Sequence, residues 1–391
     1  MFTLLAEQGY DPLVLRGRRL LPIVQGGMGV GISAHRLASA VARAGGLGTI
    51  ASVDLRHHHP DLMAAVRHCR DRDRLDEANL EALRREVTAA KAQSEGHGAI
   101  AVNVMKAVDT HAEYVRVACE AGADAIVMGA GLPLDLPEMA AGFPDVALIP
   151  ILSDARGVTL VVKKWMRKQR LPDAIVIEHP AHAGGHLGAA RLEDLADPRF
   201  EFDKVITEVR ESFKALGIAD GAIPLIAAGG VNDAAKVRAL LAAGYAGVQV
   251  GTAFAVTVEG DAHPNFKRVL AGAAREDIVE FISVAGLPAR AVKTPWLERY
   301  LKREEGLKAK AGEHLRKCAA GLECLTVCGL RDGLAKFGQF CIDTQLAAAL
   351  KGDVARGLFF RGDTPTPFGT AMRTVAETIE FLLTGRRPAG V

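Results

Sequence analysis

The stretch IPLIAAGGVNDAAKVRALLAAGYAGVQVGTAF, residues 223–254, contains two short apolar runs separated by one helical segment. Each run is apolar almost throughout, as is typical of parallel strands that are covered on both faces. The segment between them ends in Ala-Ala-Gly, a glycine stop that directly precedes the second run. We therefore interpret this stretch as a strand–helix–strand unit of a parallel sheet.

The same alternation of apolar runs and helical segments extends back to residue 20. Eight runs predict an α/β fold of the (β/α)8 TIM barrel class, in which functional groups follow the C-terminal ends of the strands. A long helical stretch at 60–95 is predicted to be an insertion. After residue 284 the repeat stops, so we expect a barrel over 1–284 and a helical C-terminal extension, packed on the barrel, over 285–391. The eight runs are residues 20–25, 46–52, 99–105, 124–129, 147–153, 173–178, 223–229 and 246–251.

Charge and hydropathy exclude several classes of protein. The formal net charge is +2, from 48 Lys and Arg against 46 Asp and Glu, which leaves no electrostatic footprint for nucleic acid or an anionic membrane. No uncharged apolar run reaches about 18 residues, and the N-terminus MFTLLAEQGYDP is too polar for a signal peptide. We expect a cytoplasmic protein with a small-molecule substrate; the subunit number stays open, with a homodimer as one alternative.

A glycine-rich loop, QGGMGVGIS at 25–33, follows the first apolar run. Glycines at such a position form a tight turn or clear space for a ligand. One alternative is a Rossmann unit, because residues 29–34 fit G-x-G-x-x-A and Asp54 follows the next strand. A doubly wound sheet does not predict the further glycine motifs downstream, and these favour the barrel.

Two of those motifs follow the seventh and eighth strands. The usual phosphate site of a barrel is built by the loops at these two places. Backbone N–H groups where a strand gives way to a helix bind phosphate well. We predict a phosphate cradle here, although the glycines could instead serve only as tight turns. Its residues are Gly229, Gly230, Gly251 and Thr252.

The loop after the sixth strand, EHPAHAGGHLGA at 178–189, combines three histidines with a Gly-Gly pair. Gly184 and Gly185 would allow close backbone approach to a ligand, and the histidines favour a site at the barrel mouth. No carboxylate or cysteine in the loop completes a zinc set at familiar spacing, so we predict no metal there.

Four cysteines are bunched late in the chain with the spacing C-x5-C-x3-C-x12-C. Four thiols could hold zinc or an iron–sulfur cluster, but this spacing matches no C-x2-C signature. We favour apolar packing of these side chains. They are Cys318, Cys324, Cys328 and Cys341.

Five motifs, in order, resemble the nitronate monooxygenases, formerly called 2-nitropropane dioxygenases. Related families are the flavin-dependent enoyl-acyl-carrier-protein reductases and NADH:quinone reductases. The resemblance spans about residues 20–270. Its motifs are PIVQGGMGVG (22–31), AVNVM (101–105), AGGHLG (183–188), AAGGV (227–231) and GYAGVQVGTAF (244–254).

The resemblance implies FMN in the mouth of the barrel. Gly26, Gly27 and Met28 would then lie against the edge of the flavin ring. Asn103 would face the flavin, although it could instead satisfy backbone groups in the barrel. Gly184, Gly185 and the phosphate cradle would complete the cofactor site.

The resemblance also assigns the chemistry. His186 corresponds to the family's active-site histidine, which would act as a base or as a hydrogen-bond donor to the substrate. His182 replaces the family's usual glutamate, so it could share the catalytic role. We expect oxidation of alkyl nitronates with dioxygen. The alternatives are an NAD(P)H-dependent enoyl or quinone reductase that uses FMN, and a non-redox barrel that binds a phosphorylated ligand.

Overall fold

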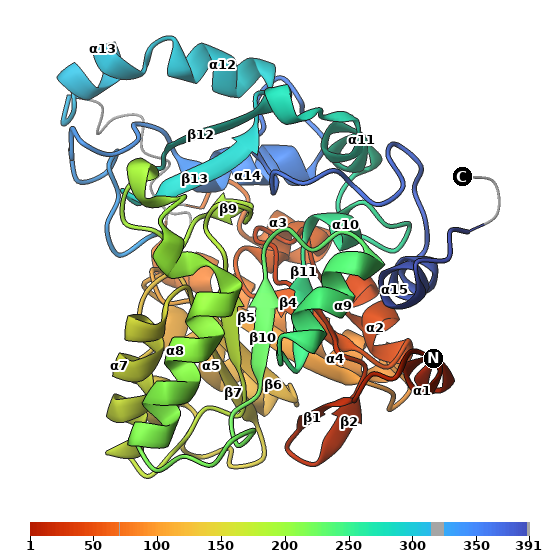
Figure 1. Cartoon of the computed structure of the whole chain (residues 1–391). Coiled ribbons are helices and arrows are strands. Elements are labelled where there is room, and N and C mark those ends of the chain that lie inside the picture. The colour runs from red at the N-terminus through yellow and green to blue at the C-terminus, as the bar shows by residue number, and fades with distance from the viewer. Residues whose placement is uncertain (70, 314–323, 389–391) are drawn as a thin grey trace.

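The computed structural model describes residues 1–69, 71–313 and 324–388. Eight parallel strands close into a barrel in the order β10-β11-β3-β4-β5-β6-β7-β8 (Figure 1). The (β/α)8 barrel is confirmed. Its strands are β3 (Ile23–Gln25), β4 (Leu47–Ala51), β5 (Ala99–Met105), β6 (Ala125–Gly129), β7 (Ala147–Leu152), β8 (Ile175–Glu178), β10 (Leu225–Ala228) and β11 (Gly247–Val250).

Alternate residues of each strand point to opposite faces of the barrel wall. On β5, Ala99 and Ala101 belong to the cluster inside the barrel, whereas Ile100 and Val102 belong to the cluster between the strands and the helices. Leucines of an N-terminal hairpin, β1 (Leu13–Leu15) and β2 (Arg18–Leu20), join the inner cluster. The interior is therefore packed with side chains below the mouth.

Helices cover the outside of the barrel. The expected insertion at 60–95 is corrected here, because α4 packs between α2 and α5 and is therefore the barrel helix that follows β4. Only a short 3₁₀ turn and α3 (Pro60–Ala65) are additional at this place. The covering helices after the first seven strands are α2 (His35–Arg43), α4 (Arg72–Gln93), α5 (His111–Glu120), α6 (Leu136–Met139), α7 (Ala155–Met166), α8 (Phe202–Ala215) and α9 (Ala234–Ala242).

The last helix of the chain, α15 (Val375–Thr384), returns to the barrel and packs against α9, α2 and α1 (Phe2–Gln8) (Figure 1). A capping box fixes its start, because Thr374 Oγ1 accepts from Glu377 N at 3.2 Å and Glu377 Oε2 accepts from Thr374 N at 2.8 Å. The helix takes the place that follows β11, so the chain after 284 does not all lie outside the barrel.

Between β11 and α15 the chain builds a layer over the C-terminal ends of the barrel strands (Figure 1). A small antiparallel sheet organises this layer: β13 pairs with β12, with β14 and with β9 from the loop after β8. The elements are α10 (Thr252–Ala255), α11 (Pro264–Gly272), β12 (Ile278–Ile282), β13 (Pro288–Val292), α12 (Pro295–Leu301), α13 (Glu304–Ala309), α14 (Ile342–Leu350), β14 (Phe359–Phe360) and β9 (Gly185–His186).

The expected boundary at residue 284 falls in the turn between β12 and β13, and the extension is not purely helical. Charged residues hide these strands from a hydropathy pattern: Glu280 and Arg290 lie directly opposite each other in the ladder and form an ion pair at 2.6 Å. Such a pair stabilises a strand pairing without an apolar run.

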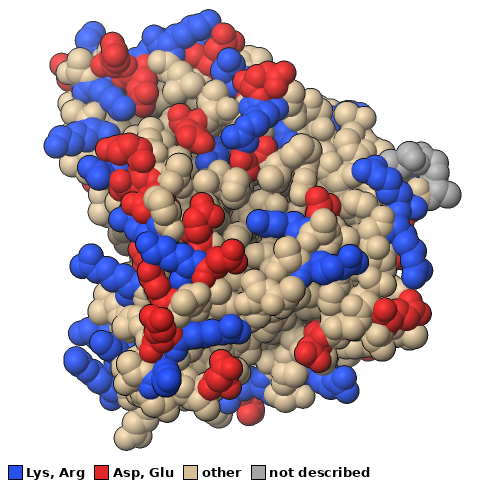
Figure 2. Space-filling model, viewed as in Figure 1, with Lys and Arg blue, Asp and Glu red and all other residues tan. Residues whose placement is uncertain are grey.

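Charge singles out no macromolecular surface on the face of the molecule that Figure 2 shows. Figure 2 shows Lys and Arg intermingled with Asp and Glu over the face in view. Of the helices in the described ranges, none has both the length and the apolar character that a membrane span requires.

Candidate functional site

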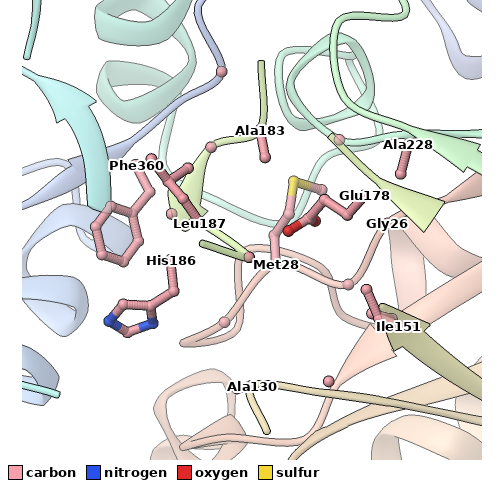
Figure 3. Close-up of a pocket in the computed structure, with 18 of the residues that line it drawn as sticks. Gly26, Met28, Ala130, Ile151, Glu178, Ala183, His186, Leu187, Ala228 and Phe360 are labelled. Carbon is pink, nitrogen blue, oxygen red and sulfur yellow. The ribbon is translucent and has the colours of Figure 1, made fainter. Parts of the chain in front are cut away.

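The upper layer of the barrel interior opens into a cavity of about 640 Å³ between the strand ends and the overlying sheet. Such a volume lies within the range of small-molecule and cofactor sites. Every residue predicted as a site residue lines this one cavity, part of which Figure 3 shows. They are Gly26, Gly27, Met28, Asn103, His182, Gly184, Gly185, His186, Gly229, Gly230, Gly251 and Thr252.

Because side chains alternate between the two faces of a strand, every second residue of a barrel strand points inward, and the last of these enter the cavity. On β5, Asn103 continues the inward series of Ala99 and Ala101. By the same period of two, Glu178 follows Val176 on β8, and Gln249 follows Gly247 on β11. Both line the cavity, and our reading of the sequence missed both of them. The inward parity of the strands was the signal that could have found them.

Gly27 is required by the protein itself. A Cβ added there would lie 2.3 Å from Asn103 Cβ, so only glycine allows the first loop to pass over that side chain. A Cβ on Gly26 would make ordinary contact with Gln249 at 3.5 Å. The bare backbone of this loop is therefore explained in part by close approach to Asn103, and not solely by a ligand.

The turn after β10 contains two glycines in the left-handed region, Gly229 at φ +98° and Gly230 at φ +73°. A Cβ on Gly230 would lie 3.1 Å from His182 Cβ, so this turn packs directly against the histidine loop. Asp233 caps α9 and accepts from Lys236 N at 2.8 Å. Because that carboxylate already serves the first turn of α9, an anion would be held by the glycine turn itself rather than by the helix end.

A segment from the far end of the chain closes the cavity above the glycine loops; we call residues 360–365 the roof segment. A Cβ on Gly184 would lie 2.5 Å from Gly362 N, so glycine is needed where the roof segment crosses. Thr252 Oγ1 accepts from Gly362 N at 3.2 Å. The roof segment therefore joins the loops after β8 and β11.

His182 has a charged environment. Its Nδ1 lies 3.1 Å from Asp363 Oδ2, and Arg275 Nη1 donates to the same carboxylate at 2.7 Å. Burial alone would raise the pKa of Asp363, but hydrogen bonds from His182 and Arg275 hold it at about 2. Asp363 is therefore a carboxylate at all ordinary pH values, and it orients the His182 ring.

His186 has a largely apolar environment. It lies on β9, paired with Ala289 of β13, and its ring centroid is 5.7 Å from that of Phe360 (Figure 3). Its Nε2 lies 2.9 Å from Ser283 Oγ, which also accepts from Ala285 N. Burial lowers the pKa of His186 to about 4, so the imidazole is neutral at physiological pH.

The third histidine of the loop is structural. His179 is 3% exposed, and its carbonyl accepts from the N–H groups of His182 and Ala183 at 3.1 Å. Arg290 of β13 holds the same loop, because its Nη1 donates to the carbonyls of Pro180 and Ala183. These contacts fix the loop that presents His182 and His186.

The cysteines form no metal centre in the part of the chain that is described. Cys324 lines the cavity, Cys328 is buried and Cys341 is half-buried; all three are free thiols. Within the described ranges, no three His, Cys, Asp or Glu side chains are arranged to hold a metal ion. Cys318 lies outside the described residues.

Comparison with known proteins places the sequence next to one family. The family model described as nitronate monooxygenase matches residues 18–357. A probable nitronate monooxygenase of Bacillus subtilis is 30% identical over 138 residues, which are 35% of this chain and 37% of that protein. This chain aligns with less than half the length of several such curated relatives.

Two further similarities cover more of the chain. A Mycobacterium tuberculosis protein named (3aS,4S,5R,7aS)-5-hydroxy-7a-methyl-1-oxo-octahydro-1H-indene-4-carboxyl-CoA dehydrogenase is 28% identical over 299 residues, 74% of this chain and 67% of that protein. The structure of FabK from Thermotoga maritima matches with a TM-score of 0.64 and 24% identity over 93% of this chain and 91% of that one. The structural similarity supports the fold.

Proposed function

The chain belongs to the nitronate monooxygenase family, and from that premise we propose that it is an FMN-dependent oxidoreductase that oxidises alkyl nitronates with dioxygen. The observation that carries the proposal is the neutral His186 imidazole, set in a mainly apolar wall of the cavity. The family membership gives no support to the alternative of a non-redox barrel.

The residues around the cavity fit a flavin nucleotide. The glycine turn at Gly229 and Gly230, together with Gly251 and Thr252, offers backbone N–H groups and a hydroxyl to a phosphate. The first loop, which is hydrogen-bonded to the end of β11, and Asn103 on β5 would bound the ring. When bound, FMN would supply the acceptor for substrate electrons and pass them to dioxygen.

His182 belongs to the phosphate end of this arrangement. The Gly230 turn packs against it, and the Asp363 carboxylate orients its Nδ1. The contact with Asp363 fixes the ring, and an imidazole N–H group at this place can donate to a neighbouring phosphate. We therefore assign His182 to cofactor retention, and His186 to the chemistry.

His186 acts on a substrate that is already an anion. A base with a pKa of about 4 is poorly matched to removing a carbon-bound proton at neutral pH. A neutral imidazole can still donate its one N–H group to an anionic oxygen. A nitronate needs no deprotonation and has two such oxygens, so the site favours nitronates over neutral nitroalkanes.

An anaerobic titration tests this proposal. Purified protein with bound FMN is mixed in separate cuvettes with propyl-2-nitronate, with 2-nitropropane and with NADPH or NADH, and the flavin absorbance is followed. We expect bleaching by the nitronate and little by the others. Rapid bleaching by a nicotinamide nucleotide alone would contradict nitronate oxidation as the main activity.

A second candidate is a reductase or dehydrogenase of acyl thioesters that uses the same flavin. The alignment with the Mycobacterium tuberculosis indene-4-carboxyl-CoA dehydrogenase named above, over 74% of this chain, favours it. In this case NAD(P)H would reduce the flavin, and an enoyl thioester would reoxidise it anaerobically.

A homodimer stays a prediction, which light scattering of the purified protein can test.

A further inference from the structure

Glu178 is a carboxyl group inside the cavity with no assigned role. It is the last residue of β8, and its inward parity directs the side chain into the cavity, where Figure 3 shows it among the lining residues. Its position on the ladder is opposite Ala228, which precedes the glycine turn. Glu178 therefore lies at a strand end next to the expected phosphate cradle, in the cavity that the first loop also lines.

Of the other carboxyl groups that line the cavity, Asp154 is engaged by the backbone and Asp343 lies against a second carboxyl. Asp154 caps α7 and accepts from Gly157 N at 2.7 Å. Both oxygens of Asp343 are buried, and its carboxyl interacts with that of Asp54. Beyond the backbone pairing of β8, the Glu178 side chain makes no hydrogen bond or ion pair with any residue in the described ranges. Its oxygens are therefore available to a ligand.

The charge of Arg290 acts on Glu178, but the guanidinium of Arg290 makes its hydrogen bonds to other groups. Its Nε and Nη2 donate to Glu280 at 3.0 and 2.6 Å, and its Nη1 donates to backbone carbonyls of the histidine loop. Burial raises the pKa of Glu178 to about 7, and the charge of Arg290 offsets only part of this shift. The remaining titratable or charged side chains around the cavity are Asp154, His182, His186, Cys324, Asp343 and Arg361.

We propose that Glu178 is a redox-linked proton site, which takes up one proton from solvent when the flavin is reduced and returns it when the flavin is reoxidised. The inference deepens the proposed function and depends on flavin binding in this cavity. The substrate is oxidised and supplies the electrons, and the solvent proton forms the carboxyl O–H bond. That bond breaks on reoxidation, when dioxygen takes the electrons.

The proton uptake has a physical cause: negative charge is added close to the Glu178 carboxylate in a poorly hydrated cavity. Electrons added to a ligand in the cavity repel a carboxylate there, and a bound ligand also displaces the water that solvates it. Both effects favour the protonated form of Glu178 in the reduced enzyme. Where the oxidised enzyme holds an ionised Glu178, reduction is therefore accompanied by proton uptake.

Potentiometric titration of the FMN-loaded protein tests this inference without measuring turnover. The midpoint potential is followed from about pH 5 to about pH 9, a range that spans the pKa of about 7. Each proton linked to a two-electron couple adds about 30 mV per pH unit to the slope. We expect the wild type to show this extra slope over part of the range and Glu178→Gln to lack it.

Two controls isolate the effect. Glu208→Gln makes the same carboxyl-to-amide change on the outer helix α8, and it should keep the wild-type slope. His182→Asn, measured at saturating FMN, removes another titratable side chain of the cavity, and it should keep the contribution of Glu178. A slope lost in His182→Asn and kept in Glu178→Gln would assign the proton to the histidine and overturn the inference.

The remaining outcomes separate this inference from the proposed function. If flavin is bound to both proteins and the plots of midpoint potential against pH are parallel for the wild type and Glu178→Gln, the proposed proton site at Glu178 is wrong. The proposed function is unaffected by this outcome. A wild-type protein that retains no flavin after incubation with FMN would overturn the proposed cofactor, and the inference with it.

Discussion

His182 and His186 stand four residues apart in one loop, yet the fold gives them opposite environments. His182 faces a carboxylate that Arg275 also holds, whereas His186 faces a serine hydroxyl and a phenyl ring. The first environment fixes the His182 ring through its contact with Asp363, whereas burial in the second keeps the His186 imidazole neutral. The position of a histidine in a motif therefore does not determine its chemistry; the segment that folds over it does.

The largest effect on activity should come from replacing His186, the histidine that we assign to the chemistry. His186→Asn removes the imidazole but keeps a side chain of similar polarity, and we expect kcat/KM for nitronate to fall about 10²–10³-fold. FMN content should change little, because no predicted phosphate contact is lost. Steady-state kinetics and flavin absorbance measure the two effects; activity near that of the wild type would reject the assignment.

A change in the glycine turn of the expected phosphate cradle should affect retention of the cofactor. Gly230→Val places a branched side chain at φ +73° and against His182, at a cost of about 1–3 kcal/mol. We expect FMN affinity to fall roughly ten- to hundredfold, as measured by fluorescence titration.

Gly221→Val is the matched control for strain. Gly221 has φ +75°, and a Cβ there would meet nothing within 4 Å. The same backbone strain at this site should leave FMN affinity unchanged. Equal losses in both variants would show that the effect of Gly230 is general destabilisation and not loss of a phosphate site.

The contacts of Asp363 with His182 and Arg275 should appear in the pH dependence of stability. The folded pKa of Asp363, about 2, lies below its ordinary value, so the carboxylate stabilises the fold above about pH 4, and this stabilisation is lost as the pH falls toward 2. We expect Asp363→Asn to lower the unfolding free energy by about 2 kcal/mol at pH 7. Urea denaturation measures this; a difference that persists undiminished at pH 2 would contradict it.

The smallest effect should come from the hydroxyl that orients His186. Ser283→Ala removes one hydrogen bond, worth about 1 kcal/mol, so kcat/KM should fall roughly fivefold with FMN content unchanged. Since burial sets the pKa of His186, its ionisation should stay near pH 4 in the variant. A new inflection near neutrality in the pH profile would show that Ser283, rather than burial, keeps the ring neutral.

The sequence predicts the lower half of the site well. The strands are apolar on both faces, and Gly229, Gly230 and Gly251 mark the turns at their ends, so the barrel and its cavity follow from local patterns. The helix α4 was misread as an insertion because its length and charge differ from those of its neighbours. Its packing between α2 and α5 is a tertiary contact, which the periodicity of the sequence does not predict.

The upper half of the site could not be predicted. Ser283, Phe360 and Asp363 are 97 to 181 positions from the histidines that they contact, and no motif marks them. The sheet that brings Ser283 and Phe360 to His186 depends on the opposed charges of Glu280 and Arg290, which interrupt the hydropathy pattern. These long-range partners decide how the two histidines differ.

The most direct test of the account is a crystal structure of the protein with FMN. We predict the phosphate at the turn of Gly229 and Gly230 beside His182, and the isoalloxazine ring between the Gly26–Met28 loop and His186. A phosphate bound at the opposite end of the cavity, or FMN bound outside it, would contradict the separation of roles between the two histidines.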